Sequence, residues 1–557
     1  MIQYLKKARA QLDWKFYFLW LFSWAIVAFG QPSWSLILSP IASVCGYSLF
    51  WLTLTKIRER KPRFLHACFW FMCVQAIQLS WMTATTYHGF YILLVYLFVL
   101  IWFGVQFGVL TLYFPVDLRF SFVDCFVLSG LWTLMEWSRL FFLCGFPFNF
   151  LGVTLAGFSV SSQLAAVVGV LGLSFIVMLM NTLGFKAFLY PKFSHWLIYL
   201  GVIAFVYLFG IMHLAYHNGK MRESWAIYKV ALVQTGLKPE EKVPLTEKIQ
   251  NFVSPFEQWS RILSYLEKED PMQLDLIVLP EAALPYGATQ EIYFLEDVKN
   301  ILHKAWGNSY KNHLPMVEED RDYVSNAFWA QTIANYYQCE LIIGFDDYDK
   351  FTKQSYNAAF HFFPKKDEPE RYEKCILVPL AEYLPFSILK PLVAKYGITD
   401  FATHGTGAKV FGEKIPIAMS VCYEECFSHL IRQGRVKGAH LFVNVTNDGW
   451  YLPSKLPYQH FYHARLRSIE NGVPLLRACN TGVTAVINSV GIIQAKLAVE
   501  EGSEIFKGAL ITSFPLYYYS TLYTMYGDYF IIGVSIGIVG VFVVKRSRSF
   551  RRLTASV

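Results

Sequence analysis

Three polar side chains that together could transfer an acyl group stand at the ends of predicted strands. Glu281 follows the apolar run 274–279, and Cys422 follows the apolar run 415–421. Lys374 lies at the end of another predicted strand. Active sites of layered α/β proteins collect at strand ends, so we expect the carboxylate, the ammonium and the thiol to share one site.

Each of these three groups has a role in acyl transfer through a covalent intermediate. A carboxylate can take the thiol proton, the thiolate can attack a carbonyl carbon, and an ammonium can hold the developing oxyanion. Cys422 lies where a buried strand runs out into a sharp turn, with a helix starting behind it. The positive end of that helix would favour the thiolate. We therefore predict Cys422 as the nucleophile, Glu281 as the base and Lys374 as the oxyanion partner.

A metal site is the alternative interpretation of the cysteines and histidines near the predicted nucleophile. Cys422, Cys426 and His429 are close in sequence, and His460 and His463 are three residues apart on a predicted helix. Two ligands on one helix are necessary for a zinc site but not sufficient. Because Cys422 already has a chemical role, the sequence predicts neither a metal nor another cofactor.

The composition of the chain describes a molecule of two parts. Of the 557 residues, 55% are hydrophobic and only 16% are charged, whereas a soluble protein has about 25% charged residues. The deficit is concentrated in residues 1–215 and 529–544. The roughly 300 residues between them have the composition of a soluble domain large enough for its own hydrophobic core.

The apolar parts of the sequence predict a polytopic α-helical membrane domain of about eight spans. Seven spans fall within residues 1–215, a catalytic domain follows at 216–525, and a final helix with a basic tail occupies 526–557. Residues 1–30 also have the basic start and apolar middle of a signal peptide, but the further spans would keep the chain in the membrane. Segments of the roughly 20 apolar residues that a bilayer requires are predicted at 16–30, 34–54, 65–84, 90–114, 122–143, 164–184, 194–213 and 529–544.

Lysine and arginine are distributed unevenly among the connections between the predicted spans. Every basic connection falls on one side of the membrane if all the spans are real, and that side is cytoplasmic. The catalytic domain then lies outside the cytoplasm, and the net charge of +8 reflects orientation rather than binding to nucleic acid. The residues that set the orientation are Lys6, Lys7, Arg9, Lys56, Arg58, Arg60, Lys61, Arg63, Arg119, Lys186, Lys192, Lys545, Arg546, Arg548, Arg551 and Arg552.

Short β-rich runs alternate with helical stretches through much of the catalytic domain, which predicts α/β layering. The runs 340–344 and 357–363 have no helix between them, so part of the sheet should be antiparallel. The other predicted strands lie at 229–234, 274–279, 415–421, 440–445, 473–478 and 483–488, and predicted helices lie at 245–268, 325–338 and 458–471.

Motifs around the three candidate catalytic residues resemble those of the nitrilase superfamily, which has a Glu-Lys-Cys triad. They are Leu279-Pro280-Glu281, Tyr372-Glu373-Lys374 and Val421-Cys422-Tyr423-Glu424. Together with the predicted spans, they resemble the membrane-embedded branch of that superfamily, the apolipoprotein N-acyltransferases. The resemblance covers nearly the whole chain. Further matches are Leu377-Val378-Pro379-Leu380-Ala381-Glu382, Asn447-Asp448-Gly449-Trp450, Gln459-His460-Phe461, Arg477, Asn480-Thr481-Gly482 and Gly145-Phe146-Pro147.

The resemblance implies an extracytoplasmic, nitrilase-like αββα sandwich and a two-step acyl transfer at a bacterial inner membrane. A phospholipid would give its sn-1 acyl chain to the cysteine. The α-amine of a lipoprotein's N-terminal diacylglyceryl-cysteine would then take the chain as an amide. The family's roles fall on Glu281 as base, Lys374 as oxyanion partner and Cys422 as nucleophile, with support from Glu382, Tyr423 and Glu424.

The sequence departs from the family at two places, and two other functions stay open. No tryptophan follows Val233-Gln234, and Phe148 stands where a tryptophan is common. Both departures concern selection of the acyl chain or headgroup rather than the triad. A membrane-tethered amidase could use the same triad to release acyl groups to water, and a catalytically inactive lipid- or lipoprotein-binding protein could share the fold.

Two ionisable residues, Glu136 and Arg139, lie in the predicted membrane domain. They are three residues apart in sequence, hence on one helix face. Ionisable residues at membrane depth are costly and tend to mark function. The two could equally lie at the outer interface and bind only to each other, so the sequence leaves both interpretations open.

Overall fold

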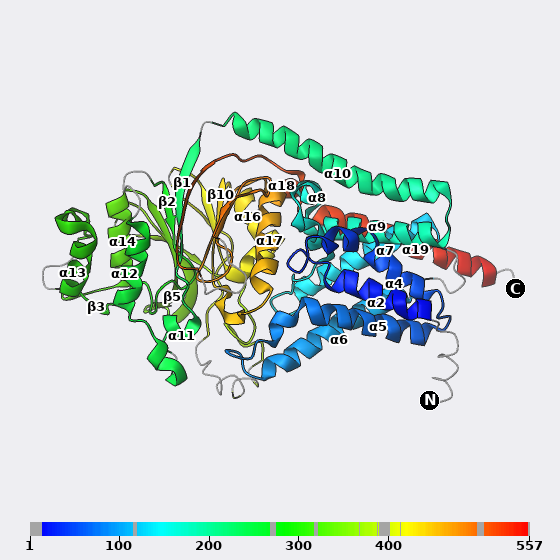
Figure 1. Ribbon diagram of the computed structural model, residues 1–557, viewed down its shortest axis with the longest axis horizontal. Coiled ribbons are helices and arrows are strands. Elements are labelled where there is room, and N and C mark those ends of the chain that lie inside the picture. Colours follow the sequence, from blue (N-terminus) through cyan, green and yellow to red (C-terminus); the bar gives the residue numbers. More distant parts are fainter. Residues whose placement is uncertain are drawn as a thin grey trace. The chain divides into compact units, whose positions relative to one another are not determined.

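The helices and sheets of the chain separate into two units (Figure 1). The first unit contains residues up to Tyr216, residues 453–455 and residues from Thr521 onward, and the second contains His217–Leu452 and Leu456–Ser520. The structure is a computed structural model, and it describes residues 14–554 except 115–119, 225, 245, 268–273, 317–320, 367, 387, 389–390, 392–400, 413 and 498–505.

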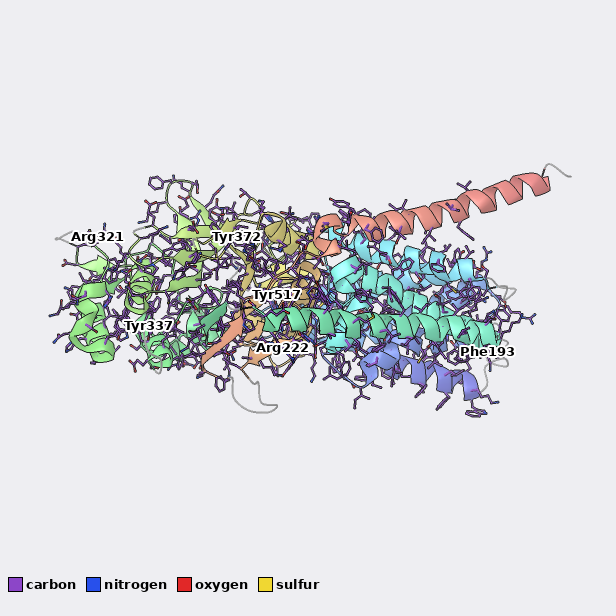
Figure 2. The ribbon with its side chains drawn as sticks, turned by 90° about the horizontal axis from the view of Figure 1, so that it is seen from above. Phe193, Arg222, Arg321, Tyr337, Tyr372 and Tyr517 are labelled. Carbon is purple, nitrogen blue, oxygen red and sulfur yellow. The ribbon has the colours of Figure 1, made fainter. Side chains whose placement is uncertain are left out.

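Helices occupy every stretch that the sequence predicts to span the membrane. Within the described residues, α6 (Tyr91–Thr111), α9 (Ala165–Leu189) and α10 (Phe193–Arg222) are long and apolar enough to cross a bilayer. Figure 2 shows α10 as one unbroken helix between its labelled ends. The total of eight spans therefore remains a prediction. The other helices in predicted spans are α2 (Trp14–Ala28), α3 (Leu38–Ile41), α4 (Tyr47–Leu54), α5 (Arg60–Gln78), α7 (Phe122–Ser138) and α19 (Tyr529–Thr554).

Part of the charge pattern that predicts the orientation cannot be followed in space. Lys6, Lys7, Arg9 and Arg119 lie outside the described residues, as do the side chains of residues 545–554. The orientation therefore still depends on the sequence pattern.

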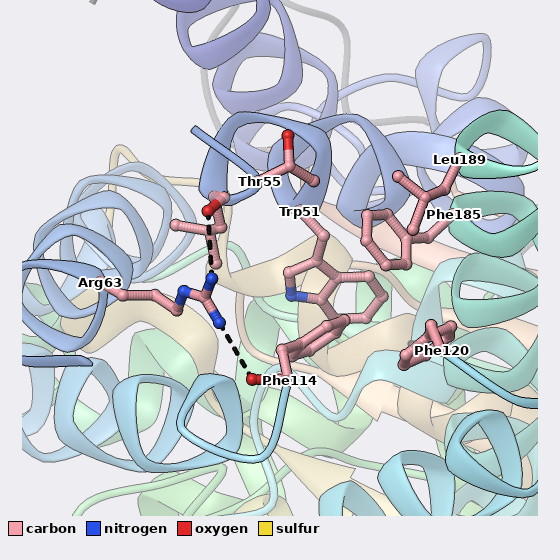
Figure 3. Close-up of a pocket in the computed structure, with 8 residues that line it drawn as sticks. Trp51, Thr55, Arg63, Phe114, Phe120, Phe185 and Leu189 are labelled. Carbon is pink, nitrogen blue, oxygen red and sulfur yellow. Dashed lines mark hydrogen bonds between the residues drawn. The ribbon is translucent and has the colours of Figure 1, made fainter. Parts of the chain in front are cut away.

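Arg63, near the start of α5, ties together the ends of two other helices of the first unit. Its guanidinium donates to the carbonyl oxygen of Phe114 at 2.9 Å and to that of Ile57 at 3.0 and 3.2 Å. These carbonyls lie three residues beyond the C-terminal ends of α6 and α4, in the connections that follow the two helices. Figure 3 shows the arginine at the edge of a small pocket with otherwise mostly apolar walls. The guanidinium thus acts as a structural clasp.

Arg63→Met is expected to lower the free energy of unfolding by about 3 kcal/mol, because it leaves buried carbonyl oxygens without a charged donor. The change should appear as a lower midpoint of thermal unfolding in detergent. Arg58→Ala is the control, since Arg58 is exposed on the same connection. An unchanged midpoint for Arg63→Met would show that the clasp does not stabilise the protein.

The second unit contains two six-stranded mixed sheets. The strand order is β14-β1-β2-β5-β6-β7 in the first sheet and β13-β12-β11-β10-β9-β8 in the second. β1, β2 and β5 are parallel, as are β9, β10 and β11. The bounds are β1 (Ile227–Gln234), β2 (Leu276–Val278), β5 (Glu340–Asp349), β6 (Gln354–Phe362), β7 (Glu370–Glu373), β14 (Gly508–Pro515), β8 (Val410–Phe411), β9 (Ile417–Val421), β10 (Leu441–Thr446), β11 (Leu475–Cys479), β12 (Ala485–Ile487) and β13 (Ile493–Lys496).

Alternating apolar side chains from both sheets form one shared core. Val230 and Leu232 of β1 and Val443 and Val445 of β10 belong to it, and all four are fully buried. Helices cover the outer face of each sheet and form two further cores with it (Figure 1). The second unit is therefore layered αββα. The covering helices are α12 (Pro255–Leu266), α13 (Leu295–Trp306) and α14 (Asn326–Tyr337) on the first sheet, and α16 (Ser428–Val436) and α17 (Leu456–Asn471) on the second.

Candidate active site

Cys422 directly follows β9, in a backbone conformation that few residues other than glycine adopt. Its φ is +52°, in the left-handed region, which is strained for a residue with a side chain. The carbonyl oxygen of Cys422 accepts a hydrogen bond from Asn444 Nδ2 at 3.3 Å and lies 3.1 Å from His460 Nε2. Side chains of β10 and α17 therefore hold the sharp turn that the sequence predicts here.

The helix expected directly behind Cys422 begins only six residues later. Only a short 3-10 turn, Cys422–Cys426, follows the strand, and α16 begins at Ser428. Burial raises the pKa of the Cys422 thiol well above its ordinary value, the Glu281 carboxylate raises it further, and Lys374 opposes the rise. The sulfur therefore keeps its proton until a base removes it.

Glu281 lies beyond the end of β2, and its backbone is fixed from several sides. Its carbonyl oxygen accepts hydrogen bonds from Lys242 Nζ at 2.9 Å and from Asn480 Nδ2 at 2.5 Å. Gly344 of β5 packs so closely that a Cβ there would lie 2.6 Å from Glu281 Cα. Any larger residue at position 344 would displace Glu281, so these contacts together determine where its carboxylate stands.

Lys374, the residue after β7, binds two carboxylates. Its Nζ lies 2.7 Å from Glu382 Oε1 and 3.5 Å from Glu281 Oε1. Asn357 of β6 donates through Nδ2 to the same two oxygens, at 2.9 and 2.8 Å. The structure thus brings Glu281, Lys374 and Glu382 into one cluster and adds Asn357, which sequence analysis does not identify.

The ammonium of Lys374 stays charged although only 1% of its side chain is exposed. Burial alone would lower its pKa, but Glu382, then Glu281 and then Cys422, hold the pKa well above the ordinary value of a lysine. A fixed positive charge that interacts with the Cys422 thiol can stabilise an oxyanion formed on a carbonyl attacked by that sulfur.

Glu424 joins the chain beside the cysteine to the chain beside the lysine. Its carboxylate accepts from the backbone N–H of Val421 at 2.8 Å, from those of Cys375 and Ile376 at 2.6 and 3.1 Å, and from the hydroxyl of Tyr372 at 2.9 Å. Burial raises the pKa of Glu424 to about 7, although the backbone donors oppose the rise. The carboxylate therefore sets the spacing between the ends of β9 and β7.

Tyr423, the remaining residue that the family resemblance implicates, packs against an aromatic neighbour. Its ring centroid lies 4.9 Å from that of Phe427, with the planes at 87°. The side chain is half-buried. The structure thus places the ring in the turn that carries Cys422.

Glu136 and Arg139 are both fully buried in the first unit. Glu136 Oε1 accepts from Trp132 Nε1 at 2.9 Å and from the backbone N–H of Leu151 at 2.7 Å. Arg139 Nε donates to Gln106 Oε1 at 2.8 Å. The interpretation in which the two bind only to each other is therefore wrong, because each has its own neutral partners.

The histidines that suggest a metal site take part in other contacts. His460 lies between carboxylates, 2.9 Å from Asp448 Oδ1 and 3.0 Å from Glu425 Oε1. In the part of the chain that the structure describes, no group of three or more histidine, cysteine, aspartate or glutamate side chains could hold a metal ion.

Lys242 is a second buried lysine at this site. Nothing in the surrounding Pro239-Glu240-Glu241-Lys242 distinguishes it from a surface lysine, so sequence analysis misses it. Burial lowers the pKa of its ammonium to about 8, although Asp346, Glu281 and Cys422 oppose the fall. The positive charge that contacts the Glu281 backbone is therefore lost as the pH rises through about 8.

Lys242→Arg is expected to retain this charge in alkaline solution. We measure the rate of Cys422 alkylation by iodoacetamide for this variant and for the unmodified protein. The ratio of the two rates should rise roughly threefold between about pH 7 and 9, because the retained charge keeps the pKa of the thiol lower by about half a unit. Lys238→Arg is the control, because Lys238 is exposed in the same segment. A rate ratio for Lys242→Arg that does not change with pH would contradict this role of the ammonium.

Two family models match the chain. The carbon-nitrogen hydrolase model matches residues 229–510, and the model of the apolipoprotein N-acyltransferase N-terminal domain matches residues 38–183. A carbon-nitrogen hydrolase from Helicobacter pylori G27 has a TM-score of 0.34 and 16% identity, covering 52% of this chain and 89% of that chain.

Two curated relatives match along nearly their whole length. An apolipoprotein N-acyltransferase from Chlamydia pneumoniae is 30% identical over 535 residues, which cover 92% of this chain and 94% of that protein. One from Chlamydia trachomatis serovar D is 31% identical over 529 residues, which cover 91% and 93%. The identity, the coverage and the two matched models together show that the chain belongs to the apolipoprotein N-acyltransferase family.

Proposed function

We propose that this protein is an N-acyltransferase that moves a fatty acyl chain from a phospholipid to the N-terminus of apolipoproteins. The observation that carries the proposal is the buried cluster in which Lys374 binds both Glu281 and Glu382. The charge of Lys374 also opposes the rise in the pKa of the Cys422 thiol. A carboxylate, an ammonium and a thiol are the groups that a two-step acyl transfer requires.

In the first step the phospholipid's ester reacts with Cys422. The Glu281 carboxylate takes the thiol proton while sulfur attacks the sn-1 carbonyl carbon. The oxyanion that forms is stabilised by the Lys374 ammonium. As the intermediate collapses, the carbon–oxygen bond of the ester breaks, and the leaving lysophospholipid oxygen receives the proton from Glu281. The acyl chain is then a thioester on Cys422.

In the second step an amine replaces the sulfur. The α-amine of a diacylglyceryl-cysteine has a pKa of about 7.7–8.0, so much of it is neutral at working pH. Its nitrogen attacks the thioester carbonyl, and Glu281 accepts a proton from it. The carbon–sulfur bond breaks, the amide leaves, and the Cys422 thiolate regains the proton. A thioester reacts with amines faster than an oxygen ester, so one hard step becomes two easier ones.

We place the reaction at a bacterial inner membrane, with the catalytic domain on the periplasmic side. The apolar helices α6, α9 and α10 support membrane embedding. The basic connections between predicted spans support the orientation. In this arrangement residues 1–215 and 526–557 form the membrane part and residues 216–525 the catalytic part. Both substrates are anchored in lipid, so the bilayer keeps them near the site.

The fate of the acyl group distinguishes a transferase from an amidase. Protein in vesicles is given phospholipid labelled in its sn-1 chain, then either a diacylated lipopeptide with a free α-amine or buffer alone. The proposal predicts labelled triacylated peptide in the first case and little free fatty acid in the second. Rapid release of free fatty acid in both, with no amide, would favour the amidase. Binding of both lipids without turnover would favour an inactive binding protein.

A further inference from the structure

Four charged side chains of the second unit meet beside the turn that carries Cys422. His460 Nδ1 lies 2.9 Å from Asp448 Oδ1, and its Nε2 lies 3.0 Å from Glu425 Oε1. Arg477 closes the ring, with Nε 2.8 Å from Glu425 Oε1 and Nη2 3.1 Å from Asp448 Oδ2. Each of the four is at least 97% buried. We call these four residues the charge cluster.

The charge cluster is electrically neutral only if His460 carries a proton. It contains two carboxylates and one guanidinium, so a neutral imidazole would leave both carboxylates sharing one positive charge, and a buried net negative charge is costly. Burial opposes a charged imidazole, but Glu425, Cys426 and Asp448 hold the pKa of His460 well above its ordinary value. A protonated His460 directs one N–H toward Asp448 Oδ1 and the other toward Glu425 Oε1, and Arg477 Nη2 also lies 3.0 Å from its Nδ1.

The imidazolium reaches the backbone of the cysteine. Its Nε2 is 3.1 Å from the Cys422 carbonyl oxygen and 3.0 Å from Glu425 Oε1, so its N–H can form a charge-assisted hydrogen bond shared between these two acceptors. That carbonyl belongs to the residue whose φ of +52° persists only where its surroundings enforce it. The other donor to it, Asn444 Nδ2, is farther away at 3.3 Å and is also shared with Ser420 Oγ.

The four residues come from different parts of the fold. Arg477 lies on β11, Asp448 lies just beyond β10, His460 lies on α17, and Glu425 lies in the same 3-10 turn as Cys422. A bond from each of these elements into one neutral cluster fixes the turn relative to the sheet and to the helix. The direction of the Cys422 side chain follows from the orientation of that turn.

We propose that the charge cluster is the device that holds Cys422 in its strained, productive turn, and that His460 is a positioning residue for the nucleophile. The inference rests on the proposed function, because it assumes that the sulfur of Cys422 is the atom that attacks the substrate. It assigns His460, Asp448, Glu425 and Arg477 a task in the reaction that acts through the turn that carries Cys422.

Two variants of the full-length protein in detergent test the proposal. His460→Gln keeps an N–H group near the Cys422 carbonyl but leaves the cluster with a net negative charge. The double variant His460→Gln with Asp448→Asn restores neutrality. His361→Gln is the matched control, since His361 is a buried histidine that pairs with Glu340 at 2.9 Å.

The measurements are the rate constant and the final stoichiometry of Cys422 acylation by phospholipid. His460→Gln should reach the stoichiometry of the unmodified protein but about 100-fold more slowly, the cost of displacing a reacting atom by about 1 Å. The double variant should recover to within about tenfold of the unmodified rate. The control His361→Gln should react at the unmodified rate. A merely structural role would lower the stoichiometry and leave the rate constant of the folded fraction unchanged.

Alkylation of Cys422 by iodoacetamide is followed in the same samples, so that failure of the proposed function can be distinguished from failure of the positioning role. An unmodified protein that is alkylated but never acylated would overturn the proposed function, while slow alkylation of His460→Gln would still support the positioning role. Equal rates for His460→Gln and the unmodified protein, with either reagent, would overturn the positioning role alone. So would a rate loss in His361→Gln as large as that in His460→Gln.

Discussion

Cys422→Ala is expected to lower acyl transfer to a diacylated peptide by at least about 10⁴-fold, because removing a covalent nucleophile leaves only the weaker contributions of binding and charge. No atom of alanine can carry the acyl chain, and an oxygen ester reacts slowly with an amine directly. Lys374 and both carboxylates remain in place, so phospholipid binding should survive. The measurement is transfer of a labelled sn-1 chain, with binding of a fluorescent phospholipid followed in parallel.

Cys339→Ala is the matched control for this experiment. Cys339 is 3% exposed and precedes β5 of the first sheet, whereas Cys422 follows β9 of the second. It should transfer acyl chains at the unmodified rate. If Cys422→Ala retained activity within tenfold of the unmodified protein, the nucleophile would have to be another residue. Loss of phospholipid binding together with activity would indicate instead that the variant does not fold.

Lys374→Met is expected to lower the rate of Cys422 acylation by about 10²–10³-fold, the usual effect of losing an oxyanion stabiliser. A second effect adds to the first. Glu281 and Glu382 accept from one amide, Asn357 Nδ2, at 2.8 and 2.9 Å. Without the ammonium between them, their mutual repulsion favours uptake of a proton by one carboxylate or its displacement. Glu281 is then less able to take the thiol proton.

The Lys374 prediction is tested by single-turnover acylation with phospholipid at saturating concentration. Lys409→Met is the matched control. Lys409 pairs at 2.5 Å with Oε2 of Glu373, the last residue of β7, which is the strand that Lys374 follows. The control should react at nearly the unmodified rate. A fall of less than about threefold for Lys374→Met would contradict the oxyanion role, because it corresponds to well under 1 kcal/mol.

Sequence patterns predict the layered α/β fold because they are local. Apolar runs of strand length appear at β1, β2, β5, β9 and β10, and the helices α14 and α17 fall between runs as predicted. The antiparallel pairing of β5 with β6 is confirmed, since a short connection leaves no room for a crossover helix. By contrast, β14 pairs with β1 across the whole catalytic domain. No local pattern carries that information.

The candidate site was partly predictable for the same reason. Glu281 and Lys374 follow β2 and β7 of the first sheet, and Cys422 follows β9 of the second, so all three stand at strand ends as predicted, but on two different sheets. Their supporting contacts are formed between distant segments: Asn480 binds the Glu281 carbonyl from 199 residues away in sequence. Burial of Lys242 is likewise invisible in its polar surroundings. Burial and the Glu281 carboxylate, which raise the pKa of the Cys422 thiol, are also invisible in the local sequence.

The most direct test of the account is the mass of the peptide that contains Cys422. Purified protein is incubated with phospholipid of one defined acyl chain, digested under conditions that preserve thioesters, and measured by mass spectrometry. Acyl transfer through Cys422 predicts a mass increase of one fatty acyl group on this residue, which disappears when a diacylated peptide is added. A protein that makes triacylated peptide while Cys422 never carries an acyl group would contradict it.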